Sequence, residues 1–186
     1  CFLISYGTIR MSTTIPWPNP SEVFALTIAG NHVPLLLIAI MTFVLITSSG
    51  TMALAVNFGY RKNKMVTFWL LLATALLGAL FVGMQVFEWT KLIVEEGVRP
   101  WGNPMGAPQF GAIFFMVTGF HGTHVSIGVL FLVIMAVKVV RGKMDREEPG
   151  FMTGRKQDYG MVEVMGLYWH FVDLVWVFIF AVFYLW

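Results

Sequence analysis

The sequence contains few charged residues and a single cysteine. Charged side chains make up 12% of the 186 residues, whereas soluble domains carry about 25%. Cys1 alone excludes a disulfide framework and any cysteine-built zinc or iron–sulfur site within the chain. A formal net charge of +2, with Lys and Arg placed between apolar runs, does not favour nucleic acid as a partner. Because 58% of the residues are hydrophobic, the composition excludes a soluble enzyme and indicates a small polytopic membrane protein.

Four long stretches of the sequence are almost free of charge. A helix needs about 20 residues to cross the hydrocarbon core of a bilayer, and alternating strands typical of a transmembrane barrel are missing. We therefore predict an all-α transmembrane helix bundle that forms a single membrane domain. The predicted spans are residues 33–58, 65–87, 110–140 and 161–186. Residues 1–10 are apolar but too short to cross, and we predict that they are the tail of an upstream helix.

Basic residues concentrate in two of the connections between these spans. Arg61, Lys62 and Lys64 follow the first span, and six further Lys and Arg residues lie between position 138 and position 156. Because positively charged loops stay on the cytoplasmic or matrix side, we expect both connections there and the C-terminus on the outer side. The predicted location is a bacterial plasma membrane or a mitochondrial inner membrane, with the bacterial membrane favoured.

Ionisable side chains inside a membrane span are costly, so each is a candidate functional residue. His121 and His124 share one face of the third span because they are three residues apart. That spacing suits a haem or metal pair, but no cysteine or second histidine pair completes a ligand set. Hydrogen bonds to neighbouring helices are therefore favoured, and no metal site is predicted. His32 is expected to open the first span at the membrane interface.

The fourth predicted span repeats the three-residue spacing with His170 and Asp173. Asp173 lies near the middle of the membrane and needs a partner, for which an imidazole or indole N–H is available. A proton relay and a static clamp between helices are both possible, and the clamp is favoured. We expect the third and fourth spans to pack through these two faces. Glu88, at the end of the second span, has either a buried role or a solvated position beside Lys91.

Several motifs resemble subunit III of haem–copper cytochrome c oxidases. The run TGFHGTHV at residues 118–125 is similar to one helix of that family, and YWHFVD at residues 168–173, followed by Trp176, is similar to its closing helix. The run QVFEW at residues 85–89, and Pro34-Leu35-Leu36 with Ser48-Ser49-Gly50, resemble two further segments. The matches keep their order over residues 15–186. The family's carbodiimide-reactive glutamate belongs to an upstream helix, so it is assigned to no residue of this chain.

The resemblance implies an accessory, non-catalytic core subunit of a proton-pumping terminal oxidase in aerobic respiration. Such a subunit stabilises catalytic subunit I, holds phospholipid in a helix cleft and supports proton uptake. Haem and copper would reside in partner subunits, with no cofactor in this chain except bound phospholipid. The expected polar network inside the membrane comprises Glu88, His121, His124, Trp169, His170 and Asp173.

The electron donor is open at this point. The YWHFVD motif favours cytochrome c, and the alternatives are a quinol oxidase subunit or a homologue associated with nitric oxide reductase. A proton-coupled secondary transporter, using His121, His124 and Asp173, belongs to a different class. Transporters tend to show paired repeats and broken helices, and neither is evident in the sequence, so this reading is disfavoured.

Lys138 lies near the end of the third predicted span, at a position where the family often has arginine. Anionic headgroups attract basic residues near the membrane surface, so we expect Lys138, together with Arg141, to contact a phospholipid phosphate. The alternative is that Lys138 extends its ammonium group to water without binding a particular lipid.

Overall fold

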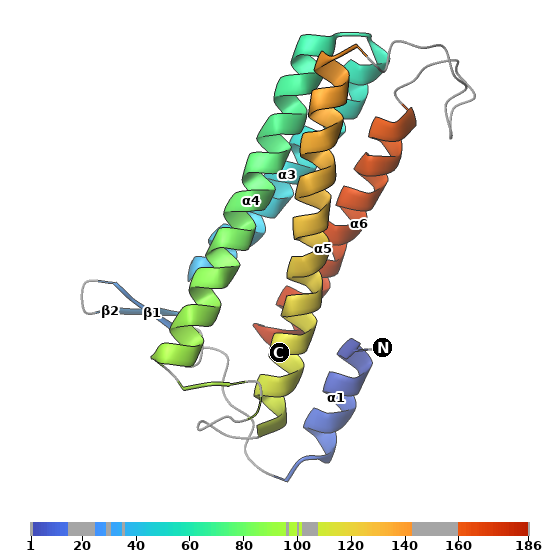
Figure 1. Ribbon diagram of the computed structural model, residues 1–186. Helices are drawn as coiled ribbons and strands as arrows, with labels where there is room; N and C mark the ends of the chain where they lie inside the picture. Colours follow the sequence, from blue (N-terminus) through green and yellow to red (C-terminus); the bar gives the residue numbers. More distant parts are fainter. Residues whose placement is uncertain are drawn as a thin grey trace. The chain divides into compact units, whose positions relative to one another are not determined.

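The structure is a computed structural model that describes residues 2–14, 25–28, 31–34, 36–95, 97–99, 101, 108–142 and 160–185. Its helices are α1 (Phe2–Ser12), α3 (Leu36–Tyr60), α4 (Lys64–Val94), α5 (Pro108–Val140) and α6 (Gly160–Phe183) (Figure 1). Helices α3 to α6 are each long and apolar enough to cross a membrane. The predicted all-α class with four membrane spans is therefore confirmed.

One element of the structure was not predicted, a short antiparallel pair of strands, β1 (Ala25–Ile28) and β2 (Asn31–Pro34). His32 lies in β2 opposite Thr27, so the prediction that His32 opens the first span is wrong. Pro34 disfavours the helical conformation for the residue before it. The first membrane helix accordingly begins at Leu36 rather than at residue 33.

The end of α4 also differs between the sequence prediction and the structure. The sequence prediction ended this span at Phe87, but the helix continues to Val94. The helix ends where the N–H of Glu95 binds the carbonyl of Lys91 and Gly97 adopts a φ of 67°, a conformation that glycine adopts at little cost. Glu88 is therefore inside a helix and not at its end.

The chain divides into two compact units that draw on different stretches of the same long helices. Unit 1 comprises Cys1–Thr42, Gly83–Thr123 and Val175–Trp186, and unit 2 comprises Phe43–Val82 and His124–Leu174. Each of α3 to α6 contributes residues to both units. That these helices form a single membrane domain stays a prediction.

The core of unit 1 is rich in aromatic rings. The ring of Phe114 lies 5.9 Å from that of Phe183 and 6.0 Å from that of Tyr184, centroid to centroid. Helix α1 joins this cluster through Tyr6, which is fully buried and lies 4.3 Å from Phe183. The cluster therefore connects α1 and α5 to the end of α6.

Unit 2 is organised around the buried indole ring of Trp169 on α6. A Cβ atom placed on Gly78 of α4 would lie 2.5 Å from the Cη2 atom of Trp169, and one placed on Gly128 of α5 would lie 2.9 Å from its Cζ3 atom. Such distances leave no room for a side chain. Small residues allow membrane helices to approach closely, and here two glycines on different helices accommodate one indole.

Candidate functional site

Three side chains of α6 form hydrogen bonds with hydroxyl groups of α3, and two of them belong to the YWHFVD segment. In unit 2 the Nε1–H of Trp169 donates to Ser48 Oγ at 3.0 Å, and Nδ1 of His170 lies 2.6 Å from Ser49 Oγ. In unit 1 the Nε1–H of Trp176 donates to Thr42 Oγ1 at 3.2 Å. In lipid an unsatisfied polar group is costly, so these hydrogen bonds fix α6 against α3 in both units.

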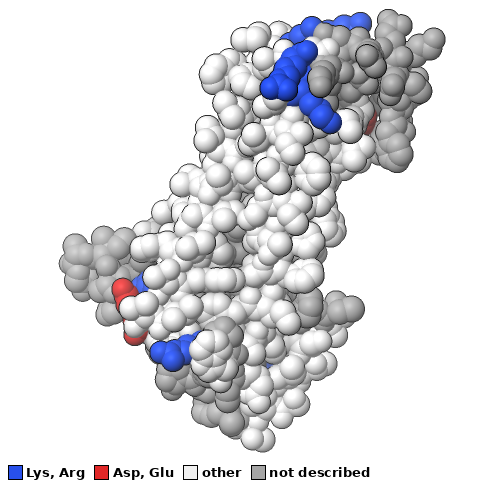
Figure 2. Space-filling view, in the orientation of Figure 1, with Lys and Arg blue, Asp and Glu red and all other residues white. Residues whose placement is uncertain are grey.

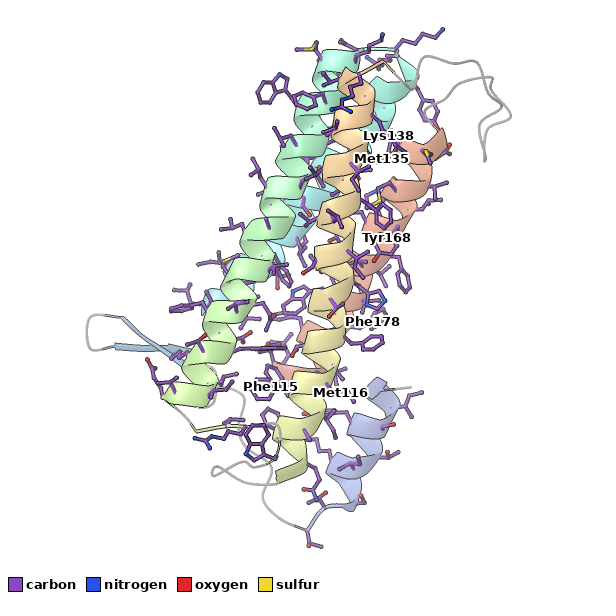
Figure 3. All side chains as sticks on the ribbon, viewed as in Figure 1. Phe115, Met116, Met135, Lys138, Tyr168 and Phe178 are labelled. Atoms are coloured by element: carbon purple, nitrogen blue, oxygen red, sulfur yellow. The ribbon has the colours of Figure 1, made fainter. Side chains whose placement is uncertain are left out.

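Contacts between α5 and α6 also involve the two candidate histidines. The imidazole ring of His121 stacks on the indole of Trp176 in unit 1, with centroids 5.3 Å apart and an interplanar angle of 27°. In unit 2 the hydroxyl of Tyr168, a residue of α6 that is labelled in Figure 3, donates to the backbone carbonyl of His124 at 3.0 Å. Both histidines thus lie against α6, His121 through its ring and His124 through its backbone carbonyl.

Asp173 is buried on α6, with 8% of its surface exposed. Neither carboxyl oxygen has a hydrogen-bond partner within the described part of the chain, although the hydroxyl of Ser49 lies beside the group. The expected pairing with an imidazole or indole N–H is therefore not met. The reason is competition, because the indole of Trp169 binds Ser48 and the imidazole of His170 binds Ser49 instead.

Glu88 occupies a second buried carboxyl site, in unit 1. Its side chain is 4% exposed. Gln85 Nε2 donates to Oε2 at 2.8 Å, and the hydroxyl of Tyr184 donates to Oε1 at 3.0 Å and lies 3.3 Å from Oε2. Of the two readings left open by the sequence, the structure supports the buried one and rejects the solvated helix end.

Helical periodicity explains why Glu88 is buried. Phe81, Gln85, Glu88 and Leu92 recur at intervals of three or four residues, and all four are buried. Residues with this spacing share one face of a helix. The sequence analysis named Gln85 only within the run QVFEW and not as a candidate site residue, although its three-residue spacing from Glu88 was a usable signal.

Other partners in these sites were not singled out individually by the sequence analysis. Tyr184 is 96 positions from Glu88, and Thr42 is 134 positions from Trp176. Ser48 and Ser49 were noted only as part of a motif. No local pattern indicates which hydroxyl on a distant helix meets which nitrogen, so these pairs are visible only in the folded chain.

The described residues contain no group of three or more His, Cys, Asp or Glu side chains that could hold a metal ion. The interactions found at the predicted site residues are hydrogen bonds and ring contacts that join helices. Glu88 lies in unit 1 with His121, whereas His124, Trp169, His170 and Asp173 lie in unit 2. These hydrogen bonds and ring contacts hold helices next to one another.

The two residues predicted to bind lipid lie at the end of α5. Lys138 is half-buried and lies one turn after Met135 (Figure 3), and Arg141, just beyond the helix, is exposed. The N–H of Arg141 binds the carbonyl of Val137, which fixes the backbone at this point. The four basic residues at positions 143–156 lie outside the described residues.

Comparison with known proteins gives a consistent picture. The family model described as "Cytochrome c oxidase subunit III" matches residues 16–186. A protein of Staphylococcus aureus named "Probable quinol oxidase subunit 3" is 35% identical over 150 residues, which is 80% of this chain and 66% of that protein. A protein of Staphylococcus epidermidis with the same name is 35% identical over 151 residues, with the same coverage. The chain thus spans 66% of the length of these relatives.

Proposed function

The chain belongs to the cytochrome c oxidase subunit III family, and from this premise we propose that it is subunit III of a bacterial haem–copper terminal oxidase that takes electrons from quinol. The choice of quinol as electron donor rests on the relatives named "Probable quinol oxidase subunit 3", one of which is 35% identical over 80% of this chain. The YWHFVD motif favours cytochrome c as the electron donor, with quinol as an alternative. The relatives favour quinol.

The proposed role is accessory and not catalytic. Haem, copper and oxygen chemistry would belong to catalytic subunit I and other partner subunits, and this chain would stabilise subunit I and support proton uptake. The hydrogen bonds of Trp169 and His170 with α3, and that of Glu88 with Tyr184 directly after α6, support a role in holding helices in place. Helices held in place in this way would supply a contact surface to the partner subunit.

The proposed location is the bacterial plasma membrane. An integral membrane protein is indicated by the four apolar helices and by the oxidase-subunit relatives. The relatives named above are bacterial. Arg61, Lys62 and Lys64 would then lie on the cytoplasmic side, with the end of α6 on the outer side.

We retain phospholipid binding at Lys138 and Arg141 as part of this proposal. A half-buried ammonium group at the end of α5, followed by an exposed guanidinium, suits the phosphate of a lipid headgroup. The variant Lys138→Leu is expected to lower the phospholipid retained per complex and to shorten sustained turnover, with little change in initial rate. Unaltered lipid occupancy in native mass spectrometry would favour simple extension of Lys138 to water.

Purification of the complex from its own membranes tests the main proposal. In mild detergent the chain should co-purify with haem-bearing subunits, and the complex should oxidise a quinol with oxygen but not reduced cytochrome c. Oxidation of cytochrome c alone would refute the proposed donor and leave the family assignment intact. Isolation of the chain without haem-bearing partners, from membranes that contain an active oxidase, would refute the accessory role.

A further inference from the structure

The charged side chains of unit 2 are segregated by sign. Its two acidic residues in the described part, Glu163 and Asp173, are half-buried and buried. Its described basic residues all lie at helix ends: Arg61, Lys62, Lys64, Lys138 and Arg141. Figure 2 shows one group of Lys and Arg at the top of the view and others near the bottom. The described part of unit 2 therefore presents cations at its helix ends, with little opposing charge from the described acidic residues.

The turn between α3 and α4 has an unusual backbone at its centre. The N–H of Lys62 binds the carbonyl of Gly59 at 3.0 Å, and the N–H of Asn63 binds the carbonyl of Phe58 at 3.2 Å. This double hydrogen bond is a common way to end a helix, with a left-handed residue that is usually glycine. Here the left-handed residue is Lys62, with a φ of 58°.

A comparison with the end of α5 shows what is unusual about Lys62. At that end the left-handed residue is Gly142, with a φ of 65°, and its N–H binds the carbonyl of Val139. A side chain in this conformation brings Cβ close to the backbone, which costs free energy. A costly conformation at an exposed lysine points to a role for its charge.

The neighbours of Lys62 extend the cationic surface of the turn. The guanidinium of Arg61 lies 5.6 Å from the centre of the Phe58 ring, a distance at which a cation is attracted to an aromatic face. Lys64 is exposed and begins α4. The N-terminal end of a helix carries the positive pole of its dipole, which also favours an anion.

We propose that the turn formed by residues 61–64 binds the phosphate of an anionic phospholipid. Lipid is chosen over a soluble anion because Met65 and Trp69 follow directly on α4, share one helix face and are 61% and 60% exposed. Tryptophan is enriched at the headgroup level of membranes. The phosphate is held by the turn, and an acyl chain runs along Met65 and Trp69.

This site uses other residues than Lys138 and Arg141 and does not depend on the electron donor of the complex. Its decisive variant is Lys62→Gly, which removes one cation and places a residue suited to a φ of 58°. A purely structural role for Lys62 predicts no change in bound lipid. The proposal predicts that phosphatidylglycerol retained by the purified complex falls, while the thermal midpoint stays the same or rises.

The matched control is Arg99→Gln, which removes an exposed cation from unit 1 and should leave retained phosphatidylglycerol unchanged. Both samples are measured by native mass spectrometry after the same detergent treatment. An equal loss in both variants, or no loss in Lys62→Gly, overturns the proposal. If excess inorganic phosphate displaces the bound lipid by occupying the turn, the site takes soluble anions and the proposal is also wrong.

A second experiment leaves every cation in place. A photo-crosslinking residue is introduced at Met65, or at the control position Leu76, which lies on the same helix and is 64% exposed. Complexes are placed in bilayers of equal phosphatidylglycerol and phosphatidylcholine. The crosslinked product at position 65 should favour phosphatidylglycerol by about fivefold, with no preference at position 76. Equal labelling of both lipids at position 65 refutes the site.

Discussion

The two buried carboxyl groups in the described part of the chain have opposite surroundings. Glu88 in unit 1 is 4% exposed and Asp173 in unit 2 is 8% exposed. Glu88 accepts hydrogen bonds from Gln85 and Tyr184, whereas neither oxygen of Asp173 has a hydrogen-bond partner in the described part of the chain. Equal burial therefore does not imply an equal structural role.

The difference lies in how each unit holds its stretch of α6. In unit 1 the carboxylate of Glu88 receives the Tyr184 hydroxyl that follows α6, so the carboxyl group itself joins two helices. In unit 2 the junction is made by Trp169, which binds Ser48 and fits against Gly78 and Gly128. Asp173 contributes no hydrogen bond to that junction within the described residues. Removal of the two carboxyl groups should therefore have very different consequences.

The largest expected effect is that of Glu88→Ala. The substitution leaves Gln85 Nε2 and the Tyr184 hydroxyl buried without their acceptor, and each such loss costs about 1–3 kcal/mol. We expect the complex to be destabilised by about 3 kcal/mol in thermal unfolding. Glu88→Gln is the control, because it keeps one acceptor oxygen and should cost about 1 kcal/mol. Equal losses for both variants would show that the hydrogen bonds are unimportant.

A smaller loss is expected from Gly78→Ala, which tests the junction of unit 2. The added Cβ would lie 2.5 Å from Trp169 Cη2 and 2.8 Å from Val129 Cγ2, and overpacking costs about 1–3 kcal/mol. The matched control on the same helix is Gly83→Ala, where no heavy atom lies within 4 Å of the new Cβ. That control should be neutral or stabilising, because alanine favours a helix. A stable Gly78→Ala complex would contradict the tight fit of Trp169.

The smallest expected effect is that of Asp173→Asn. The carboxyl group has no hydrogen bond to lose within the described residues, so the free energy of unfolding should change by less than about 1 kcal/mol. Ser49→Ala serves for comparison, because it removes the contact with His170 Nδ1 and should cost about 1 kcal/mol. A loss for Asp173→Asn as large as that for Glu88→Ala would mean that the two carboxyl groups are equivalent after all.

The sequence predicted the membrane spans better than their ends. Long apolar runs indicated α3 to α6 because length and hydropathy act over a whole helix. The ends depend on single residues. Because Pro34 disfavours a helix before it, α3 begins at Leu36 and not at residue 33. Because the buried face of α4 continues to Leu92, this helix extends beyond Glu88. The charge of Glu88 predicts a helix end, but hydrogen bonds from Gln85 and Tyr184 make its burial tolerable.

The sequence by itself determined the kind of solvent, the number of spans, the family resemblance and the polar residues worth examining. Only the tertiary structure decided which of those polar groups meet. Trp169 and Ser48 are 121 positions apart, and Glu88 and Tyr184 are 96 positions apart. Helical periodicity fixes which residues share a face, but a hydrogen bond needs two particular atoms within about 3 Å. That distance is set by how helices pack, which no local pattern encodes.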